Sequence, residues 1–240
     1  MNSTKKTARV AGLLYLLACL PAPFSLLYVP GKLMVPGDAT ATADHVRASE
    51  TLLRLGMAGE LISAAAFILV VLALYRLFKD VDKQQALLMV ILFVVSVPIS
   101  FLNVLNDIAA LILARGPDFL SVFSKGQLDA LVLLFLRLHN SGFLVAQIFW
   151  GLWLVPFGIL VIRSGFLPRV LGIFLMLACT GYLISSFSSL IVPQYAHLVS
   201  RLASILEIGE LPPALWLLIF GAKEPRAGGS LKPALPFGGA

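Results

Sequence analysis

Six long apolar segments, separated by polar stretches, make up most of the chain. They cover residues 10–28, 55–77, 86–113, 131–162, 170–191 and 198–220. Each approaches or exceeds the roughly 20 residues that a helix needs to cross about 30 Å of hydrocarbon. The pattern therefore predicts an all-α fold, a polytopic membrane protein built as a six-helix transmembrane bundle.

The first apolar segment has the form of a signal peptide or of a first membrane helix, because Lys5, Lys6 and Arg9 precede it. The run from Leu16 to Cys19 resembles a bacterial lipoprotein cleavage box, which would make Cys19 a lipidated N-terminus. The apolar run continues well past Cys19. We therefore expect a retained first helix.

The basic residues gather at the ends of the apolar segments and favour one side. Of the 18 Lys and Arg residues, eleven fall on the side of both termini and five on the opposite side, while Arg137 and Arg201 lie within or at the edge of the fourth and sixth segments. Positive residues are enriched in cytoplasmic loops. Both termini are therefore predicted to face the cytoplasm, with three helical hairpins pointing outward.

The connections and the C-terminal end carry signals of their own. Residues 44–50 are polar and predict a short surface helix that runs into the second segment. Ser124 and Gln127 have the spacing of a capping box, which would start the fourth helix before the membrane and make it about 57 Å long. Residues 1–222 are expected to form one transmembrane domain, and residues 223–240, rich in Gly, Pro and Lys, a flexible cytoplasmic tail.

The composition excludes several classes of function. The chain is 59% hydrophobic and 12% charged, against about 45–50% and 25% in soluble domains, which rules out a soluble enzyme. The net charge of +6 comes from residues at segment ends, so it reports membrane topology and not nucleic-acid binding. No Lys lies within a segment, which excludes a retinal Schiff base, and three His residues are too few for a zinc hydrolase or a bis-His haem. We expect no cofactor.

An internal repeat relates the first and fifth segments. Six residues recur at a constant offset of 160 positions: Arg9, Val10, Gly12, Leu17, Ala18 and Cys19 match Arg169, Val170, Gly172, Leu177, Ala178 and Cys179. The Gly-Glu-Leu run at residues 59–61 recurs at residues 209–211. The matches predict that helices 1–2 and 5–6 form a parallel repeat about an axis along the membrane normal, with chance similarity as the alternative.

Four acids lie within the apolar segments. A charged side chain at the bilayer centre costs about 2.5–3.5 kcal/mol, so each acid is a candidate site residue. Glu60 and Asp107 fall near the outer edge, whereas Glu207 and Glu210 lie deeper. Asp107 ends a polar stripe at helical spacing, which we expect to face a neighbouring helix; its other members are Ser96, Ser100 and Asn103.

Two adjacent prolines interrupt the sixth segment beside one of these acids. Pro212 and Pro213 lack an N–H donor and follow Glu210 closely. Interrupted helices mark the binding sites of many transporters, and a simple proline kink is the alternative. Arg137, His139 and Arg201 are the candidate cationic partners of the acids. We assign Arg137 and Arg201 to structural ion pairs.

Residues 162–172, with the sequence Ile-Arg-Ser-Gly-Phe-Leu-Pro-Arg-Val-Leu-Gly, resemble a signature of the bacterial membrane proteins grouped as domain of unknown function 4386. Residues 8–17, 33–38, 136–139 and 151–158 also resemble that family. Trp153 stands where many members carry a second His, which argues against a His-pair metal or haem site. The resemblance implies a six-helix protein of the bacterial inner membrane and carries no catalytic residue to this chain.

The leading hypothesis is a non-enzymatic protein that binds or transports a small molecule or cation, with the lipid bilayer as its surroundings and no metal. The proposed ligand-binding residues form an acidic pocket in the outer half of the bundle: Glu60, Asp107, His139, Glu207 and Glu210. One alternative is an intramembrane enzyme that acts on a lipid or isoprenoid, using Asp107, His139 and Glu207 as acid-base or metal residues. Another is a structural or partner-binding protein whose acids only pair with Arg137 and Arg201.

Overall fold

The computed structural model describes residues 3–222. Within these residues all regular secondary structure is helical, and six helical stretches are long and apolar enough to cross a membrane. They are Thr4–Leu33, Glu50–Phe78, Lys83–Arg115, Lys125–Ser164, Arg169–Ile191 and Leu198–Ile219. This confirms the predicted all-α fold with six spanning helices. The expected tail, residues 223–240, lies outside the described residues.

The first stretch is a continuous but irregular helix. It consists of α1 (Ser3–Cys19), α2 (Pro21–Pro23), η1 (Phe24–Tyr28) and α3 (Val29–Leu33). Prolines in α2 and α3 have no N–H to donate, so the regular hydrogen-bond ladder cannot continue through them. In η1 the N–H of the residue after Tyr28 bonds to the carbonyl of Phe24, five residues earlier, which makes η1 a π-turn. This turn buries Ser25 against Gly59 of the next long helix.

A separate surface helix, α4 (Ala39–Ala48), follows the first stretch. The Asp38 carboxylate caps it by accepting a 2.9 Å hydrogen bond from the N–H of Ala41. The sequence predicts a surface helix over residues 44–50, whereas α4 begins earlier and ends at Ala48. It ends because the backbone at Ser49 leaves the helical conformation (φ −126°, ψ 38°) before the next helix begins.

The next two spans are the long helices α5 (Glu50–Phe78) and α6 (Lys83–Arg115), the second with Pro98 in its interior. Asp82 caps α6 by accepting hydrogen bonds from the N–H groups of Gln84 and Gln85. Gly116, with φ 59°, ends it in the left-handed conformation that glycine adopts without strain. The short turn η2 (Asp118–Leu120) leads to the fourth span.

The fourth span is two helices, α7 (Lys125–Leu152) and α8 (Leu154–Ser164). The predicted capping box of Ser124 and Gln127 is present at its start. The span is interrupted at Trp153, where Pro156 offers no N–H to the carbonyl of Leu152. The single long helix of the sequence prediction is therefore a long helix and a shorter one.

The last two spans are α9 (Arg169–Ile191) and a broken helix, with the turn η3 (Pro193–Tyr195) between them. The broken helix consists of α10 (Ala196–Glu207), the 3₁₀ turn η4 (Ile208–Glu210) and α11 (Leu211–Ile219). Two prolines stand in the first turn of α11, where a helix does not use the missing N–H groups. The predicted interruption of the sixth helix is therefore present.

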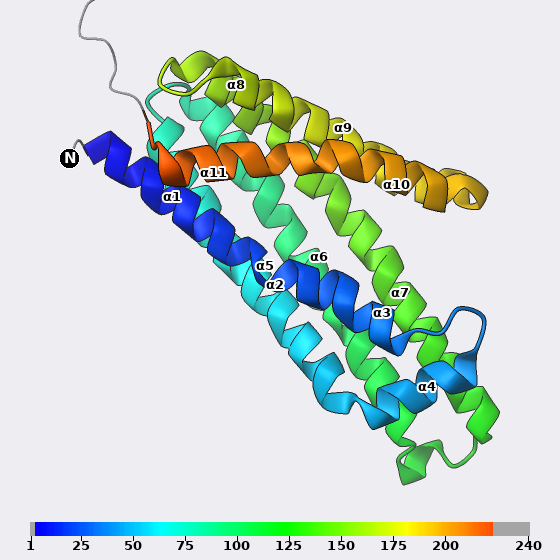
Figure 1. The fold of residues 1–240 in the computed structure, drawn as a ribbon. Helices are drawn as coiled ribbons and strands as arrows, with labels where there is room; N and C mark the ends of the chain where they lie inside the picture. The colour runs from blue at the N-terminus through cyan, green and yellow to red at the C-terminus, as the bar shows by residue number, and fades with distance from the viewer. Residues whose placement is uncertain (1–2, 223–240) are drawn as a thin grey trace, which may run out of the picture.

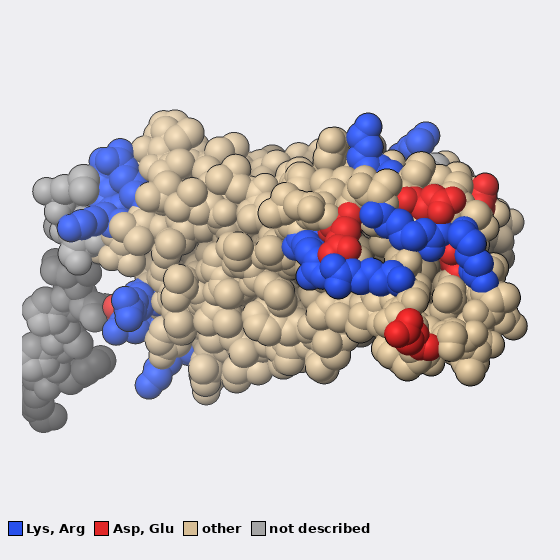
Figure 2. Space-filling view, turned by 90° about the horizontal axis from the view of Figure 1, so that it is seen from below, with Lys and Arg blue, Asp and Glu red and all other residues tan. Residues whose placement is uncertain are grey.

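The helices pack into an elongated bundle (Figure 1). Helix α6 lies along α7, α8 lies along α9, and α1 lies beside α5 and against α11. Figure 2 shows basic residues near the end at which α1 begins and α11 ends, charges of both signs toward the other end, and an uncharged zone between them on that face. Apolar side chains such as Leu69 and Leu102 are exposed on the bundle, as lipid contact requires.

The interior contains two apolar clusters. One surrounds Trp153 and Phe157, whose rings stack at 5.5 Å, together with Tyr15. The other joins α3, α4 and the adjoining ends of α5, α6 and α7 around Val46 and Leu136.

The helix α4 is held to α7 by charged side chains. The guanidinium of Arg47 and the ammonium of Lys125 each lie 2.9 Å from the Asp129 carboxylate, whose side chain is 1% exposed. Arg47 also donates to Asp44, and this hydrogen bond lowers the pKa of the Asp44 carboxyl below its ordinary value. The Asp44 carboxyl group therefore stays ionised into acid solution and keeps its pairing with Arg47 on the same helix.

Candidate functional site

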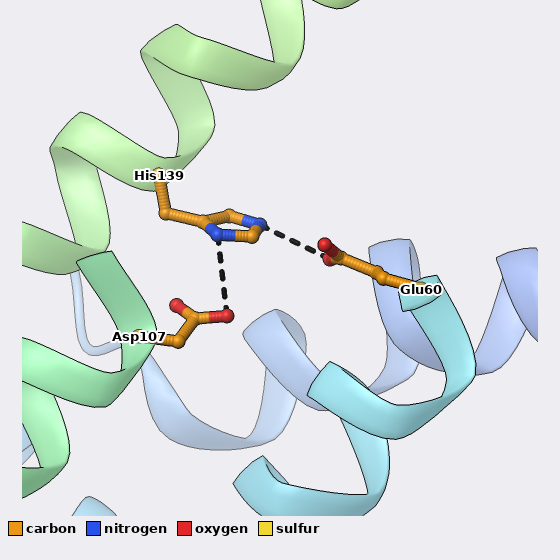
Figure 3. A group of neighbouring side chains, drawn as sticks. All are labelled: Glu60, Asp107 and His139. Atoms are coloured by element: carbon orange, nitrogen blue, oxygen red, sulfur yellow. Dashed lines mark ion pairs between the residues drawn. The ribbon is translucent and has the colours of Figure 1, made fainter. Parts of the chain in front are cut away.

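Three titratable side chains from three helices meet inside the bundle (Figure 3). Nε2 of His139 in α7 lies 3.1 Å from Oε1 of Glu60 in α5, and Nδ1 of His139 lies 3.2 Å from Oδ2 of Asp107 in α6. The side chains are 9%, 15% and 8% exposed for His139, Glu60 and Asp107. The imidazole is therefore enclosed between two carboxylates with little access to solvent.

A close contact between α6 and α7 fixes this arrangement. Gly142 has no Cβ, and the side-chain oxygen of Asn103 occupies the space where a Cβ would stand. The Asn103 amide donates a 2.9 Å hydrogen bond to the backbone carbonyl of His139. One turn further along α6, Asp107 then faces the imidazole. Asn103 and Asp107, two members of the predicted polar stripe, thus face a neighbouring helix, as the sequence predicts.

A small cavity of about 20 Å³ adjoins the three side chains. Ser25 of the π-turn η1 also lines it. Both Oγ of Ser25 and Nδ1 of His139 are buried without a hydrogen-bond partner. The three side chains can also share a metal ion. Each offers one ligand atom, and these three atoms, from Glu60, Asp107 and His139, all lie within 4.8 Å of one another.

A second, larger cavity of about 540 Å³ lies between the first stretch, α5, α6, α7 and the broken helix. Its walls are mainly apolar and aromatic, and three carboxylates face it, from Glu60, Glu207 and Glu210. No Lys, Arg or His occurs among the described residues that line it. Its aromatic residues are Tyr15, Phe67, Phe93, Phe143, Trp150, Trp153 and Tyr182.

Neutral side chains hold the two deep acids. The hydroxyls of Tyr15 and Tyr182 both donate to the Glu210 carboxylate, the latter at 2.7 Å. The side-chain amide of Gln147 donates to Glu207 at 3.2 Å. Within residues 3–222 neither acid forms an ion pair with a basic residue. No basic side chain of the described residues therefore compensates a charge on either carboxyl group.

The five predicted ligand-binding residues separate into two groups. Glu60, Asp107 and His139 form the buried cluster, and Glu207 and Glu210 lie on the broken helix. Glu60 lines both cavities and connects the groups. The set proposed for an intramembrane enzyme is not brought together as a group, because Glu207 contacts Gln147 and not the histidine.

The ion pairs predicted for Arg137 and Arg201 are not formed. In the described part of the chain neither residue pairs with any of the four acids, and both are exposed. Their helices turn these side chains to the outside of the bundle. A purely structural role for the acids, in which every carboxylate is salt-bridged and no cavity exists, does not describe this arrangement.

Sequence reasoning missed the neutral partners of the acids. Tyr15, Tyr182 and Gln147 are isolated polar groups in apolar segments, and nothing in their spacing pairs them with a carboxylate. A buried tyrosine hydroxyl does need a hydrogen-bond partner. That requirement was a usable signal for the two tyrosines, although it does not name the partner.

The fold and the site define a multi-pass membrane protein with half-buried carboxylates along a cavity between its helices. The chain belongs to the family described as Domain of unknown function (DUF4386), whose profile matches residues 10–221. This confirms the resemblance seen in the sequence. A protein of Archaeoglobus fulgidus, described as uncharacterized, is 27% identical over 156 residues, which cover 64% of this chain and 76% of the relative. No solved structure matches.

Proposed function

We propose that this protein binds or transports a lipophilic organic cation in the large cavity, without catalysing a reaction. One observation carries the proposal. The cavity of about 540 Å³ presents three carboxylates and no basic side chain among its described lining residues. An uncompensated negative field in a low-dielectric cavity selects against anions and favours cations.

The chemistry of the walls indicates the kind of cation. Aromatic faces attract cations with organic substituents, such as quaternary ammonium groups. The volume lies within the range of about 300–1,000 Å³ that is usual for small-molecule sites. Glu210 is held in place by Tyr15 and Tyr182, so this carboxylate is oriented before any ligand binds. Glu207 supplies a second carboxyl group close by.

The position of the cavity indicates how a ligand enters. Leu27 in η1, Ile208 in η4 and Leu211 in α11 line the cavity and are exposed on the bundle surface. In Figure 1 the first stretch lies against α11 and then separates from α10 toward α3. In a bilayer the surface that carries these exposed apolar residues faces acyl chains. A ligand with apolar substituents therefore enters laterally from the membrane.

The test uses tetraphenylphosphonium as the probe. Purified protein in detergent should bind it saturably, and Glu210→Gln should weaken binding about tenfold, which is about 1.4 kcal/mol. The matched control is Glu50→Gln, which removes an acid paired with Arg54 and Arg115 away from the cavity and should leave binding unchanged. Unaltered binding and unaltered flux into liposomes after Glu210→Gln would contradict the proposal, as would absence of saturable binding.

The same proposal includes the setting of the protein. We place it in a bacterial inner membrane with both termini in the cytoplasm and three hairpins pointing outward. The excess of Lys and Arg on the side of the termini supports this orientation. The repeat between helices 1–2 and 5–6 stays a prediction. It would make Glu60 and Glu210 equivalent positions, which agrees with both facing one cavity.

A further inference from the structure

The small cavity beside His139 raises a question that the organic-cation site does not answer. Asp107 and His139 line this cavity and are absent from the lining of the large one. The two nitrogens of the imidazole have different surroundings. Nε2 faces Glu60, whereas Nδ1 lies 3.2 Å from Asp107 without forming a hydrogen bond.

The contact with Glu60 assigns the proton of a neutral imidazole. When Nε2 carries the proton it donates to the Glu60 carboxylate, and Nδ1 then presents a lone pair. The Asp107 carboxylate is an acceptor as well. Two acceptors 3.2 Å apart repel each other unless a cation lies between or beside them.

Ser25 supplies a second, independent sign of an occupant. Its Oγ is buried, has no hydrogen-bond partner, and lines the same cavity as Nδ1 of His139. Buried polar groups are normally satisfied, so two unsatisfied atoms at one cavity indicate a missing partner. A volume of about 20 Å³ exceeds the 10–15 Å³ that one water-sized particle needs, so a single ion fits in this cavity.

We infer that this cavity binds one divalent transition-metal ion of the Zn²⁺ or Mn²⁺ type, ligated by Nδ1 of His139 and the Asp107 carboxylate. Glu60 accepts the proton on Nε2 and orients the ring, the carboxylate–histidine–metal arrangement common in metalloproteins. The Ser25 hydroxyl provides a further oxygen ligand. Mixed imidazole and carboxylate donors suit this class of ion.

Charge balance supports a divalent ion. Two ionised carboxylates and a neutral imidazole carry a net charge of −2, which is costly within membrane helices. A divalent cation makes the group neutral, whereas protonation of the imidazole leaves one negative charge. The ion also accepts lone pairs from both unsatisfied atoms, Nδ1 of His139 and Oγ of Ser25. A proton on the imidazole would satisfy only the nitrogen.

The experiment titrates Co²⁺ into the full chain, purified in detergent without a polyhistidine tag and stripped with a chelator. We expect visible d–d absorption that saturates at one Co²⁺ per chain and is displaced by Zn²⁺. Asp107→Asn and His139→Gln should weaken binding at least tenfold, and Glu60→Gln by about 10- to 100-fold. His45→Gln, on the exposed surface of α4, is the matched control and should bind as the original chain does.

A measurement on the unsubstituted chain keeps the inference testable if a variant does not fold. Cu²⁺ bound at the site should show the pulsed-EPR modulation of a remote imidazole nitrogen. Absence of that signal, absence of saturable Co²⁺ binding, or unchanged binding in folded His139→Gln would overturn the inference. Tetraphenylphosphonium binding depends on Glu210 and not on these ligands, so failure of one site is distinguishable from failure of the other.

Discussion

At the scale of single residues, the deepest acid is stabilised by neutral hydroxyls and not by a basic partner. Glu210 accepts hydrogen bonds from Tyr15 on α1 and from Tyr182 on α9, so one carboxylate ties three helical stretches together. Hydroxyl donors satisfy the oxygens without cancelling the charge. An Arg partner would compensate a charge on this carboxyl group, whereas the two hydroxyls do not.

The hydrogen bond from Tyr182 can be tested for its contribution to stability. Tyr182→Phe removes one of two donors to Glu210 and should lower the free energy of unfolding by about 0.6–1.7 kcal/mol, the range for interhelical hydrogen bonds in membranes. Unfolding in sodium dodecyl sulfate, followed by circular dichroism, gives the value. Tyr195→Phe at an exposed position is the control and should have little effect. Equal losses in the two variants would be evidence against this role.

At the scale of elements, backbone contacts decide which helices can approach. A Cβ at Gly12 in α1 would meet backbone atoms of Leu217 and Leu218 in α11, with the Leu217 carbonyl carbon at 2.8 Å. Backbone atoms cannot rotate away as a side chain can, so the two helices must separate if a side chain is added. Small residues at helix interfaces allow this kind of close packing in membranes.

The contact between α1 and α11 yields a second prediction. Gly12→Ala should destabilise the protein by about 1–3 kcal/mol through overpacking. Gly126→Ala in the first turn of α7 is the control, since a Cβ there meets nothing within 4 Å. This control should be neutral or slightly stabilising, because Ala is the better helix former. Thermal unfolding in detergent compares the two, and a loss of the same size in both would refute the packing argument.

The docking of α4 depends on a buried acid. Arg47→Met keeps much of the length of the side chain but leaves Asp129 with Lys125 alone, so unfolding free energy should fall by about 1.5–3 kcal/mol. Arg54→Met removes a surface pair with Glu50, and such pairs contribute about 0–1 kcal/mol. Limited proteolysis should therefore cleave near α4 faster in the Arg47 variant. Equal cleavage in both variants would contradict the assignment.

At the scale of the whole molecule, the bundle has two ends of different character. Basic residues dominate the end with the described termini, and both signs occur at the other end (Figure 2). Such an asymmetry orients a protein during membrane insertion. The orientation therefore determines which side of the membrane lies closer to each cavity.

Cysteine labelling in intact cells tests this orientation. A cysteine at Ser121, in the exposed connection between η2 and α7, should react with a membrane-impermeant maleimide. A cysteine at Lys79, exposed between α5 and α6, should react only after the membrane is opened. Neither Cys19 nor Cys179 is exposed, so both should stay unlabelled. The opposite pattern at positions 121 and 79 would reverse the proposed topology.

Features that depend on short stretches of chain could be predicted from the sequence. The length of the apolar segments determines the number of spans. The capping box of Ser124 and Gln127 marks the start of α7, and the prolines after Glu210 interrupt the sixth span. Each follows from hydrogen bonding and transfer energies within a few turns of helix. The residue types that carry the candidate sites were also identifiable, because acids are costly in hydrocarbon wherever they stand.

Only the tertiary structure decided which polar groups meet. In the fold, His139 contacts both Glu60 and Asp107, and Glu210 accepts hydrogen bonds from two tyrosines. Arg137 and Arg201 are exposed and pair with none of these acids. In lipid an apolar helix face has no preference between a neighbouring helix and an acyl chain, so hydrophobicity does not specify which faces pack. Close contacts at glycines such as Gly142 and Gly12 restrict how the helices can rotate and approach, and such contacts exist only once the chain has folded.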